Sequence, residues 1–442
     1  FRTSFGTGIA GQSGLTGYPA GTVNRHLFTG MSQGSGTAMS RGNWSSAANT
    51  IKSQSSYVNV ALQGTLDVQT RQLTVNVEVY YTGSSGQSTN YLNVALLQNN
   101  VEGPQTGAAA FYPQMILPNG KYNHNHMLRH LLTGQWGDVI TTTTSGTLIQ
   151  KQYTYTIPSQ LPLSVSGGAI KTDVNLGDLE IVAFVTETQQ EVVSGAEGPI
   201  TFTNFANTND VINKSVNSYT EICAPSLDPE IIVENNGSAT ITSMAISYDV
   251  NGGTPSVYNW TGSIPSLTKK TITLPTITFT PIASNTLNVN ITSVNGTTDG
   301  NPADNTSSLS NIIITNNKGT GQLTVNITQD RYGSETTWKI FDDQGTQVAF
   351  GGPYSDLSAN GTQFNTKKVN LPNTGCYEFF IYDSYGDGIN AGYGAGNFNI
   401  KDYNGATVLS GNGVFGSSDR DPFDQLSLTP NSEATLDKSG VA

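Results

Sequence analysis

The chain has 442 residues, which is long for one hydrophobic core, so we expect roughly two to four domains. Only 12% of the residues are charged, about half the usual share, but 36% are hydrophobic, which argues against global disorder. The formal net charge of −12 argues against binding to nucleic acid and against docking on anionic membranes, because both need a basic surface.

Two further features bear on location. No run of apolar residues approaches the ~18 that a membrane span needs, so no transmembrane segment is predicted. Many hydroxyl and amide side chains with few charges are typical of secreted, β-rich proteins, and we expect an extracellular or outer-cell-surface location. Residues 1–5 do not form a signal peptide, so we expect the chain to begin downstream of a natural start.

The first part of the chain combines a glycine-rich segment at 1–27 with a β-domain predicted at 28–205. A short helix is predicted at 41–53, where Trp44 and Ile51 lie on one helical face. From Val58 onward apolar and polar residues alternate, and this period of two marks half-buried antiparallel strands. The strands are predicted at 58–68, 73–79, 91–98, 147–157 and 179–187, with a turn at 69–72 and a long excursion at 100–140.

Two more β-domains follow. Residues 206–225 are polar and include a proline, which predicts a linker. In 226–315 short strands recur about every ten to fifteen residues between turn signals, which predicts an immunoglobulin-like sandwich that a polar turn region closes. A third β-domain is predicted at 321–430, followed by a polar tail at 431–442. The predicted strands are 230–234, 239–249, 257–262, 270–275, 286–293, 322–328, 336–342, 346–350, 366–370, 376–382, 397–402 and 406–410, and the turn region is 295–308.

The acidic loop from Asp383 to Ile389 is the strongest candidate for a site. It follows a predicted strand and places the carboxylates of Asp383 and Asp387 four positions apart, with glycines at 386 and 388. Glycine permits the backbone angles by which such a loop turns its oxygens onto a hard cation such as Ca²⁺. The alternative is a turn whose aspartates bond to their own backbone.

One loop rarely supplies the six to eight oxygens that Ca²⁺ takes, and the spacing is not that of an EF-hand. Other acidic groups of the third domain could share the ion if their loops converge at one end of the sandwich. These are Asp330, Glu335, Asp419 and Asp421.

Three histidines, His124, His126 and His130, lie close together in the excursion. On a helix His126 and His130 share a face, as in zinc enzymes, but the glutamate of the metalloprotease motif is missing. The alternative is that these imidazoles form hydrogen bonds in a loop–helix connection.

Cys223 and Cys376 allow one disulfide, with two free thiols as the alternative. The sequence has no Gly-x-Ser-x-Gly elbow and no phosphate-binding loop, and neither cysteine has a histidine near it in sequence. Nucleophilic catalysis needs a base within hydrogen-bond reach, so we expect a protein that is not an enzyme.

The N-terminal half resembles a known family. The segment from Gly17 to Arg25 resembles the end of a thioredoxin-like domain, in which the counterpart of Pro19 is typically cis, and 122–130 and 134–138 resemble the β-domain that follows. Together they resemble the twenty-eight-kilodalton outer-membrane-protein family of Bacteroidota over about 1–205. The Cys-x-x-Cys half of the thioredoxin-like domain is absent from this chain, so oxidoreductase activity is not implied.

The remaining domains resemble modules of bacterial surface proteins. Residues 226–315 are similar to the cell-adhesion-related CARDB domain, as in Val233 to Ser238 and Tyr248 to Gly253. Residues 321–425 resemble a module at the ends of secreted Bacteroidota peptidases and adhesins. In such proteins a sorting domain of the type nine secretion system usually follows, so the resemblance implies a product trimmed after sorting.

The predicted fold is mainly β: tandem sandwiches, immunoglobulin-like or jelly-roll-like, after a short remnant of a thioredoxin-like fold. We expect a non-enzymatic surface protein that acts in adhesion or as a subunit of an extracellular assembly such as a filament, with itself or another surface protein as partner. A carbohydrate- or peptide-binding module beside a secreted hydrolase is the alternative, with Tyr385 and Tyr393 stacking on a glycan. A thiol oxidoreductase would require an upstream Cys-x-x-Cys.

Overall fold

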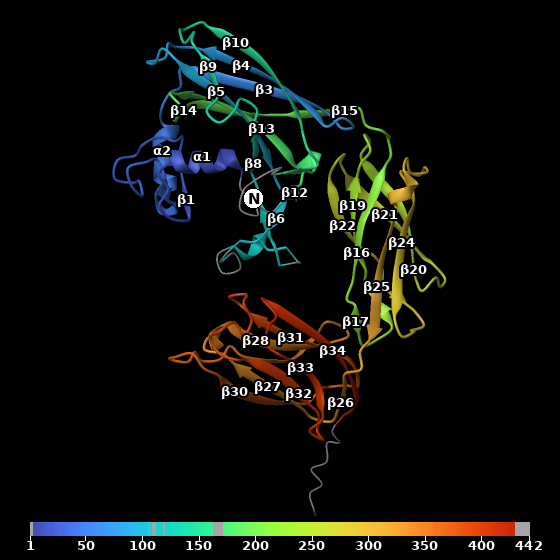
Figure 1. The fold of residues 1–442 in the computed structure, drawn as a ribbon. Coiled ribbons are helices and arrows are strands. Elements are labelled where there is room, and N and C mark those ends of the chain that lie inside the picture. Colours follow the sequence, from blue (N-terminus) through green and yellow to red (C-terminus); the bar gives the residue numbers. More distant parts are fainter. Residues whose placement is uncertain (1–2, 106, 108–111, 118–119, 162–170, 429–442) are drawn as a thin grey trace, which may run out of the picture.

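Three β-sandwiches follow one another along the chain, each with its own hydrophobic core (Figure 1). The computed structural model describes residues 3–105, 107, 112–117, 120–161 and 171–428. The prediction of a mainly β protein with tandem sandwiches is confirmed. The tail predicted at 431–442 lies outside the described residues.

A small helical unit precedes the sandwiches. Its core is Phe28, Met39 and Ala47, so the boundary predicted at residue 27 is wrong, because Val23 packs on the same core as residues further along the chain. The Tyr18–Pro19 peptide bond is cis, as predicted. The elements of the unit are α1 (Ser4–Gln12), β1 (Ala20–Gly21), β2 (Met39–Ser40), η1 (Arg41–Asn43) and α2 (Trp44–Lys52).

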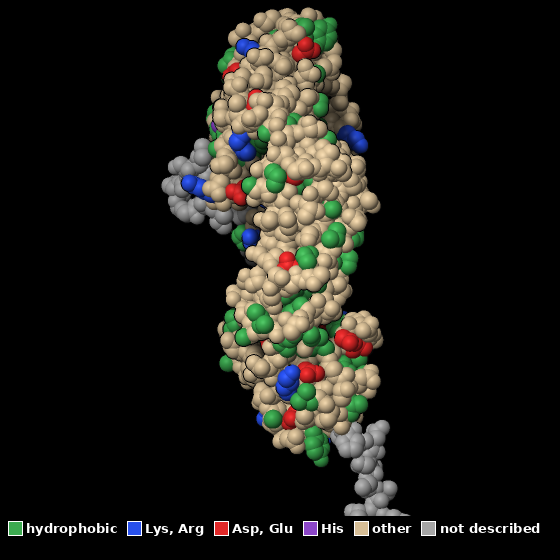
Figure 2. Space-filling model, turned by 90° about the vertical axis from the view of Figure 1, so that its right-hand side faces the viewer, with side chains coloured by type: hydrophobic (Ala, Val, Ile, Leu, Met, Phe, Trp, Pro, Cys, Tyr) green, Lys and Arg blue, Asp and Glu red, His purple; other side chains and the backbone are tan. Residues whose placement is uncertain are grey.

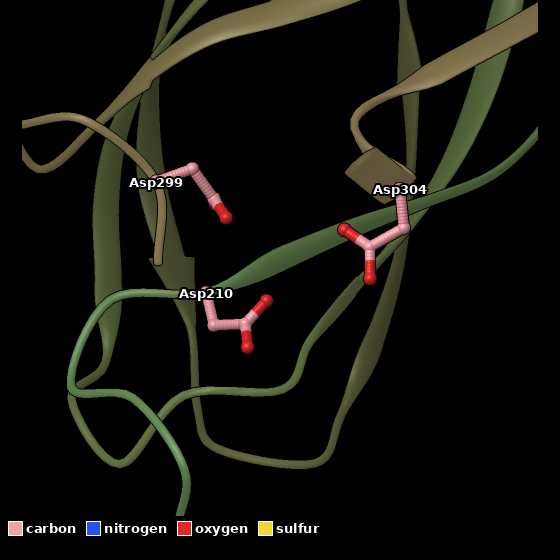
Figure 3. Close-up of side chains that lie close together, drawn as sticks. All are labelled: Asp210, Asp299 and Asp304. Atoms are coloured by element: carbon pink, nitrogen blue, oxygen red, sulfur yellow. The ribbon is translucent and has the colours of Figure 1, made fainter. Parts of the chain in front are cut away.

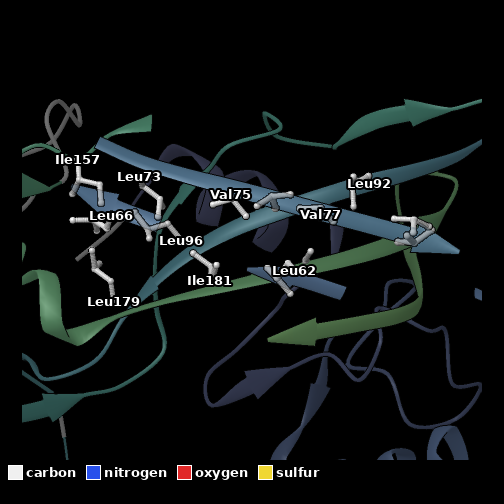
Figure 4. Close-up of a cluster of buried hydrophobic side chains, with 14 of the residues drawn as sticks. Leu62, Leu66, Leu73, Val75, Val77, Leu92, Leu96, Ile157, Leu179 and Ile181 are labelled. Carbon is white, nitrogen blue, oxygen red and sulfur yellow. The ribbon is translucent and has the colours of Figure 1, made fainter. Parts of the chain in front are cut away.

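The first sandwich packs a sheet of order β10-β4-β3-β15 on a second sheet of order β14-β13-β5-β8, with β9 also paired to β5. Alternate residues of β3 and β4 point inward, and Figure 4 shows Leu66, Leu73 and Ile181 in the core between the sheets. Full burial of each such side chain contributes about 1.5–3 kcal/mol. The strands are β3 (Val58–Asp67), β4 (Gln72–Tyr81), β5 (Asn90–Gln98), β8 (Met127–Leu131), β9 (Asp138–Ile140), β10 (Leu148–Thr156), β13 (Leu179–Glu187), β14 (Glu191–Gly198) and β15 (Ile200–Thr203).

The excursion at 100–140 contains short strands around the histidines, and not the helix on which His126 and His130 would share a face. His130 lies in β8 and stacks on Tyr155, with ring centroids 4.0 Å apart, and His126 lies in the turn before β8 at a φ of 53°. An extended strand rises about 3.3 Å per residue, so residues four apart are separated by roughly 13 Å along the chain, and His126 and His130 do not form the helical zinc pair. The other short elements are β6 (Val101–Gly103), η2 (Pro113–Met115), β7 (Tyr122–His124), β11 (Gln160–Leu161), β12 (Thr172–Asp173) and η3 (Leu176–Asp178).

The second sandwich begins inside the segment that we predicted as a linker. Residues 211–217 form β16, which pairs with β19, so the prediction of a linker over the whole of 206–225 is wrong. Val211 and Val216 are buried there, although the segment as a whole is mostly polar. One sheet has the order β16-β19-β22, the other β17-β25-β24-β20-β21. The elements are β16 (Val211–Asn217), β17 (Glu221–Ile222), β18 (Ser226–Leu227), β19 (Glu230–Asn235), β20 (Ile241–Val250), β21 (Ser256–Ile264), β22 (Lys269–Thr273), β23 (Ile277–Thr278), β24 (Asn285–Val294), η4 (Pro302–Asp304) and β25 (Thr306–Ile314).

The third sandwich pairs a sheet of order β26-β34-β31-β28-β29 with one of order β30-β27-β32-β33. Its last strand, β34, lies in a segment that we treated as a loop, and it carries charges and a proline. Pro422 is tolerated because it faces Glu378 of β31, in a stretch of β34 that β26 does not pair. The elements are β26 (Lys318–Thr320), β27 (Leu323–Gln329), η5 (Gly333–Glu335), β28 (Thr336–Asp342), β29 (Gln347–Gly351), β30 (Gln363–Val369), β31 (Gly375–Asp383), β32 (Asn397–Lys401), β33 (Thr407–Gly411) and β34 (Ser418–Ser427).

A disulfide joins the second and third sandwiches. Cys223 follows β17 of the second sandwich, Cys376 lies in β31 of the third, and the two residues are paired with Cα atoms 5.6 Å apart. Of the two alternatives that the sequence left open, the structure therefore shows the disulfide.

Arg420 of β34 fills the same junction. Its Nη1 donates to the backbone carbonyl of Glu221 at 2.9 Å, and Nη2 pairs with Glu378. The guanidinium lies over the ring of Tyr219, 3.5 Å from the centroid. One side chain thus satisfies groups of both sandwiches.

The first junction is apolar. Leu267, between β21 and β22 of the second sandwich, is 7% exposed and belongs to the core cluster of the first. Gly177 is needed opposite it, because a Cβ atom there would lie 2.1 Å from the carbonyl oxygen of Leu267.

Neither α1 nor α2, at nine residues each, nor any other helix in the described ranges has the length and apolar character of a membrane span.

We expect replacement of both cysteines by serine (C223S/C376S) to lower the unfolding temperature of the second and third sandwiches. The bond closes a sequence separation of 153 residues, and such a cross-link typically contributes about 2–4 kcal/mol by restricting the unfolded chain. Scanning calorimetry should show the shift, with the transition of the first sandwich moving least. Reductant should move the wild type onto the variant profile and leave the variant unchanged; identical profiles for both proteins would contradict the prediction.

Candidate metal centre

The Asp383–Ile389 loop forms a tight turn at the end of β31. Gly386 and Gly388 have φ values of 96° and 77°, in the left-handed region that favours glycine. At Gly388 a Cβ atom would also lie 2.6 Å from the carbonyl oxygen of Gly413. Asp383 Oδ1 accepts hydrogen bonds from the backbone N–H of Gly386 at 2.6 Å and of Asp387 at 3.4 Å. The hydrogen bonds expected of the alternative, a turn whose aspartate bonds to its own backbone, are therefore present.

A third carboxylate joins the loop from a distant part of the sequence. Glu335 ends η5, and its carbonyl accepts the N–H of Ser384 at 3.0 Å, which holds η5 against the loop. Glu335, Asp383 and Asp387 each offer an oxygen atom, and these atoms lie within 4.8 Å of one another. The structure thus brings together three of the six residues that we predicted as candidate ligands.

The other three candidates, Asp330, Asp419 and Asp421, lie outside this group of three. Asp330 is 3% exposed, and its Oδ1 accepts the N–H of Tyr332, but it interacts with Asp387 only through its charge. Asp419 and Asp421 lie in β34 opposite Ile381 and Phe379, because 418–427 is an extended strand and not a loop that could fold back.

Asp356 is an acidic neighbour that the sequence analysis missed. Its charge raises the pKa of both Glu335 and Asp330, and its Oδ1 accepts the N–H of Ser334 at 2.9 Å. It lies in an irregular segment between β29 and β30, where no motif distinguishes it.

The carboxyl groups destabilise one another's charged forms. Burial raises the pKa of Glu335 to about 7, and the charges of Asp383 and Asp387 add to the effect. Burial also raises the pKa of Asp383 to about 6, with a contribution from Asp387 that the backbone hydrogen bonds oppose. Among the described residues, no ion pair joins this group to a Lys or Arg.

The group of three fits a hard divalent cation. Carboxylate oxygens are the ligands that Ca²⁺ takes, and three carboxylates offer up to six of them, with water supplying the remainder of a six- to eight-fold shell. A bound cation would also offset the mutual repulsion of the acids. Binding of Ca²⁺ stays a prediction.

The aromatic residues divide into core and surface. Trp338 is 1% exposed and donates from Nε1 to the hydroxyl of Tyr354 at 2.8 Å, so it belongs to the core. Tyr385, on the acidic loop, is 57% exposed, and Tyr393 is 39% exposed with its ring edge against Tyr332. The two tyrosines are thus free to contact a ligand.

Together, the fold and this site define a protein of tandem β-sandwiches with a candidate structural ion site. Residues 9–197 match the family model described as outer membrane protein Omp28, which confirms the resemblance predicted for this part of the chain. This match supports a protein of the outer membrane or cell surface.

Several solved structures are similar to parts of the chain. A domain of the outer membrane lipoprotein Omp28 from Porphyromonas gingivalis is 20% identical, with 34% of this chain and 93% of that chain covered and a TM-score of 0.21. HBP35 of the same organism is 15% identical, with 61% and 80% covered and a TM-score of 0.33. The CARDB domain of PF1109 from Pyrococcus furiosus, in complex with di-metal ions, is 19% identical, with 24% and 89% covered and a TM-score of 0.20. No curated protein matches the chain.

We expect the third sandwich without metal to be more stable in mild acid than at pH 8. The raised pKa values mean that the folded carboxyls hold protons more tightly than the unfolded chain does. This stabilisation is complete below about pH 4 and is lost as the pH rises through about 6 for Asp383 and about 7 for Glu335. Ca²⁺ needs the charged forms, so at pH 8 it should stabilise the sandwich by about 2.7 kcal/mol when free Ca²⁺ is about 100 times Kd.

The measurement is thermal unfolding of the full chain in EDTA and in Ca²⁺ at several pH values. Asp387→Asn should remove the response of the third sandwich's unfolding transition to Ca²⁺ and flatten the pH dependence of that transition, whereas Asp343→Asn, an exposed acid of the same sandwich, should change neither. An equal Ca²⁺ response of that transition in wild type and Asp387→Asn would show that the loop is only a turn.

Proposed function

We propose that this chain is a non-enzymatic protein of the cell surface that acts as a subunit of an extracellular assembly or in adhesion. The Omp28 match over 9–197 supports the location. A disulfide is typical of proteins that fold in an oxidising compartment, which supports export. The family resemblance implies a Bacteroidota source and the type nine secretion system as the export route.

The pairing of the cysteines and the residues that line the surface hollows support a role without catalysis. Cys223 and Cys376 are paired with each other, so neither is a free nucleophile. Two surface hollows, of 480 and 440 Å³, are lined mainly by Gln, Ser, Thr and Asn, with no His or Cys among their lining residues. Figure 2 shows one face of the molecule on which neutral side chains and backbone predominate and charges are scattered.

The observation that carries the assembly proposal is the free edge of β21. This strand of nine residues pairs with β20 on one side only, and it contains no Lys, Arg, Asp, Glu or Pro. Val257 on it is 62% exposed. A long uncharged edge strand presents unpaired backbone groups that another chain can extend by β-augmentation.

Two other edge strands of the described sheets carry charges that oppose such pairing, and the uncharged edge strands β15, β29 and β33 have only four or five residues. β22, at the edge of the facing sheet, carries Lys269 and Lys270, and β10, the other edge strand of nine residues, carries Lys151. β21 is therefore the longest uncharged edge strand of the described sheets, which makes it the strand suited to contact between subunits.

We expect the wild-type chain to self-associate at high concentration and Val257→Lys to weaken this association roughly tenfold. In an assembly, the added lysine would lie against the strand of the neighbouring chain and repel it or its own copy there. Position 257 is exposed in the single chain, so folding should be preserved. Sedimentation over a concentration series measures the effect. Thr271→Lys on β22 adds the same charge to an edge that already carries two lysines and should leave the association unchanged. A wild-type chain that stays monomeric at the highest concentration would overturn the assembly proposal.

The second candidate function is binding of a glycan or peptide by the exposed aromatics of the third sandwich. Tyr385 and Tyr393 are exposed close to the acidic loop, and sugar rings stack on such faces. If the protein binds glycans, Tyr385→Ala should weaken binding roughly tenfold or more on a glycan array, as for an aromatic anchor. Tyr403→Ala removes a tyrosine that is 69% exposed elsewhere on the sandwich and serves as the control. If Tyr385→Ala binds glycans as strongly as Tyr403→Ala does, or if the wild type binds no glycan at all, the result would count against this function.

A further inference from the structure

A second group of carboxylates lies at the start of the second sandwich. Asp210 directly precedes β16, and Asp299 and Asp304 lie in the connection between β24 and β25. One oxygen atom of each residue lies within 4.8 Å of the others, and Figure 3 shows the three side chains pointing toward one another.

Two oxygen atoms in this group are buried without a hydrogen-bond partner. Asp210 is 1% exposed; its Oδ2 accepts from the side-chain amides of Asn207 at 2.8 Å and Asn236 at 3.2 Å, but its Oδ1 accepts from no group. Oδ1 of Asp304 is likewise buried and without a partner. Buried polar atoms are nearly always bonded, so each such atom indicates a missing ligand.

The third carboxylate is held in place by the backbone. Asp299 Oδ2 accepts the N–H of Val211 at 2.8 Å, and Oδ1 accepts the N–H of Asn301 at 2.7 Å. These bonds fix the side chain between β16 and the β24–β25 connection. Within the described part of the chain, no ion pair links any of the three acids to a Lys or Arg. Burial and the charge of Asp210 raise the pKa of both Asp299 and Asp304, which is consistent with acids that face each other unneutralised.

We propose that Asp210, Asp299 and Asp304 bind a Ca²⁺ ion. All three ligands are hard oxygen donors, which suit Ca²⁺ and Mg²⁺ better than zinc or copper. Mg²⁺ usually keeps several waters and takes one or two carboxylates, so three convergent carboxylates favour Ca²⁺. The ion supplies the partner that Oδ1 of Asp210 and Oδ1 of Asp304 lack.

The position of the site gives the ion a structural role. Residues 204–210 connect β15 of the first sandwich to β16 of the second, and backbone bonds already tie this connection to the end of the second sandwich. The N–H of Gly300 donates to the carbonyl of Asn209 at 2.9 Å, and the N–H of Ser238 donates to that of Asn207 at 3.1 Å. Ca²⁺ on Asp210 anchors the connection to the β24–β25 loop and so stiffens the first junction beside Leu267.

The test counts bound Ca²⁺ in the full chain, in an Asp387→Asn background that removes the candidate site of the third sandwich. By equilibrium dialysis at about 10 mM Ca²⁺, above the 10⁻⁴–10⁻³ M typical of extracellular modules, this background should bind about one ion per chain. Asp210→Asn in the same background should bind none. Asp228→Asn, an exposed acid of the same sandwich, should still bind about one. A background that binds no Ca²⁺, or equal binding with Asp210→Asn, would overturn the proposal without bearing on the third sandwich or on the edge of β21.

Thermal unfolding separates the ion from the alternative of a shared proton. In EDTA, Asp210→Asn should unfold at a temperature equal to or higher than the background, because a buried unpaired charge is gone; in Ca²⁺ the order should reverse. Asp304→Asn, at a half-buried position, repeats the test should Asp210→Asn fail to fold. Stabilisation by acid alone, with no response to Ca²⁺, would mean that the carboxyls share a proton and would overturn the proposal.

Discussion

The junction between the second and third sandwiches is closed by the Cys223–Cys376 bond, and the arrangement of the whole molecule depends on this closure. Each sandwich has its own core and could move as a separate body, since interfaces between domains of one chain are usually modest. The disulfide removes that freedom at one junction. Arg420 adds a hydrogen bond to Glu221 and a cation–π contact with Tyr219 across the same junction. At the other junction Leu267 achieves the same end by burial in its neighbour's core. The open curve of the three sandwiches in Figure 1 is therefore held at both bends by specific contacts.

The acidic loops show that the surroundings of an aspartate turn decide whether the pKa of the aspartate is lowered or raised. Asp402 accepts the backbone N–H groups of Asn404 and Ala406 and the hydroxyl of Thr320, and these bonds lower its pKa. Asp383 also accepts two backbone N–H groups, yet its pKa rises to about 6, because burial and the nearby charge of Asp387 outweigh those bonds. An aspartate turn alone thus says little about metal binding. Convergence of several such turns without a basic partner is the informative feature, and it occurs at both acidic groups.

The sequence predicted most of the strands, because alternation such as that of β3 and β4 records which side chains face a core. It failed where tertiary pairing overrides local composition. β34 holds a proline and four charged residues but completes a sheet with β31, and β16 lies in a polar segment. The candidate site was half predictable: Asp383 and Asp387 share one loop, whereas Glu335 joins them only through the fold. Asp210 and Asp299 were missed entirely, because they lie far apart in the sequence and belong to no motif that spacing could reveal.

Stiff junctions matter most to a protein that works by repeated contact. Addition of a strand to β21 would form backbone hydrogen bonds along nine residues, but association also loses whatever freedom the sandwiches had beforehand. A chain whose junctions are already fixed by a disulfide, a buried leucine and, as proposed, a Ca²⁺ ion loses less on binding, so the same edge binds more tightly. The lysines on β22 and β10 act in the opposite sense at their own edges, because they discourage pairing there. Rigidity and edge charge together would therefore direct growth to one strand, which is what an ordered assembly requires and a collection of loosely linked domains lacks.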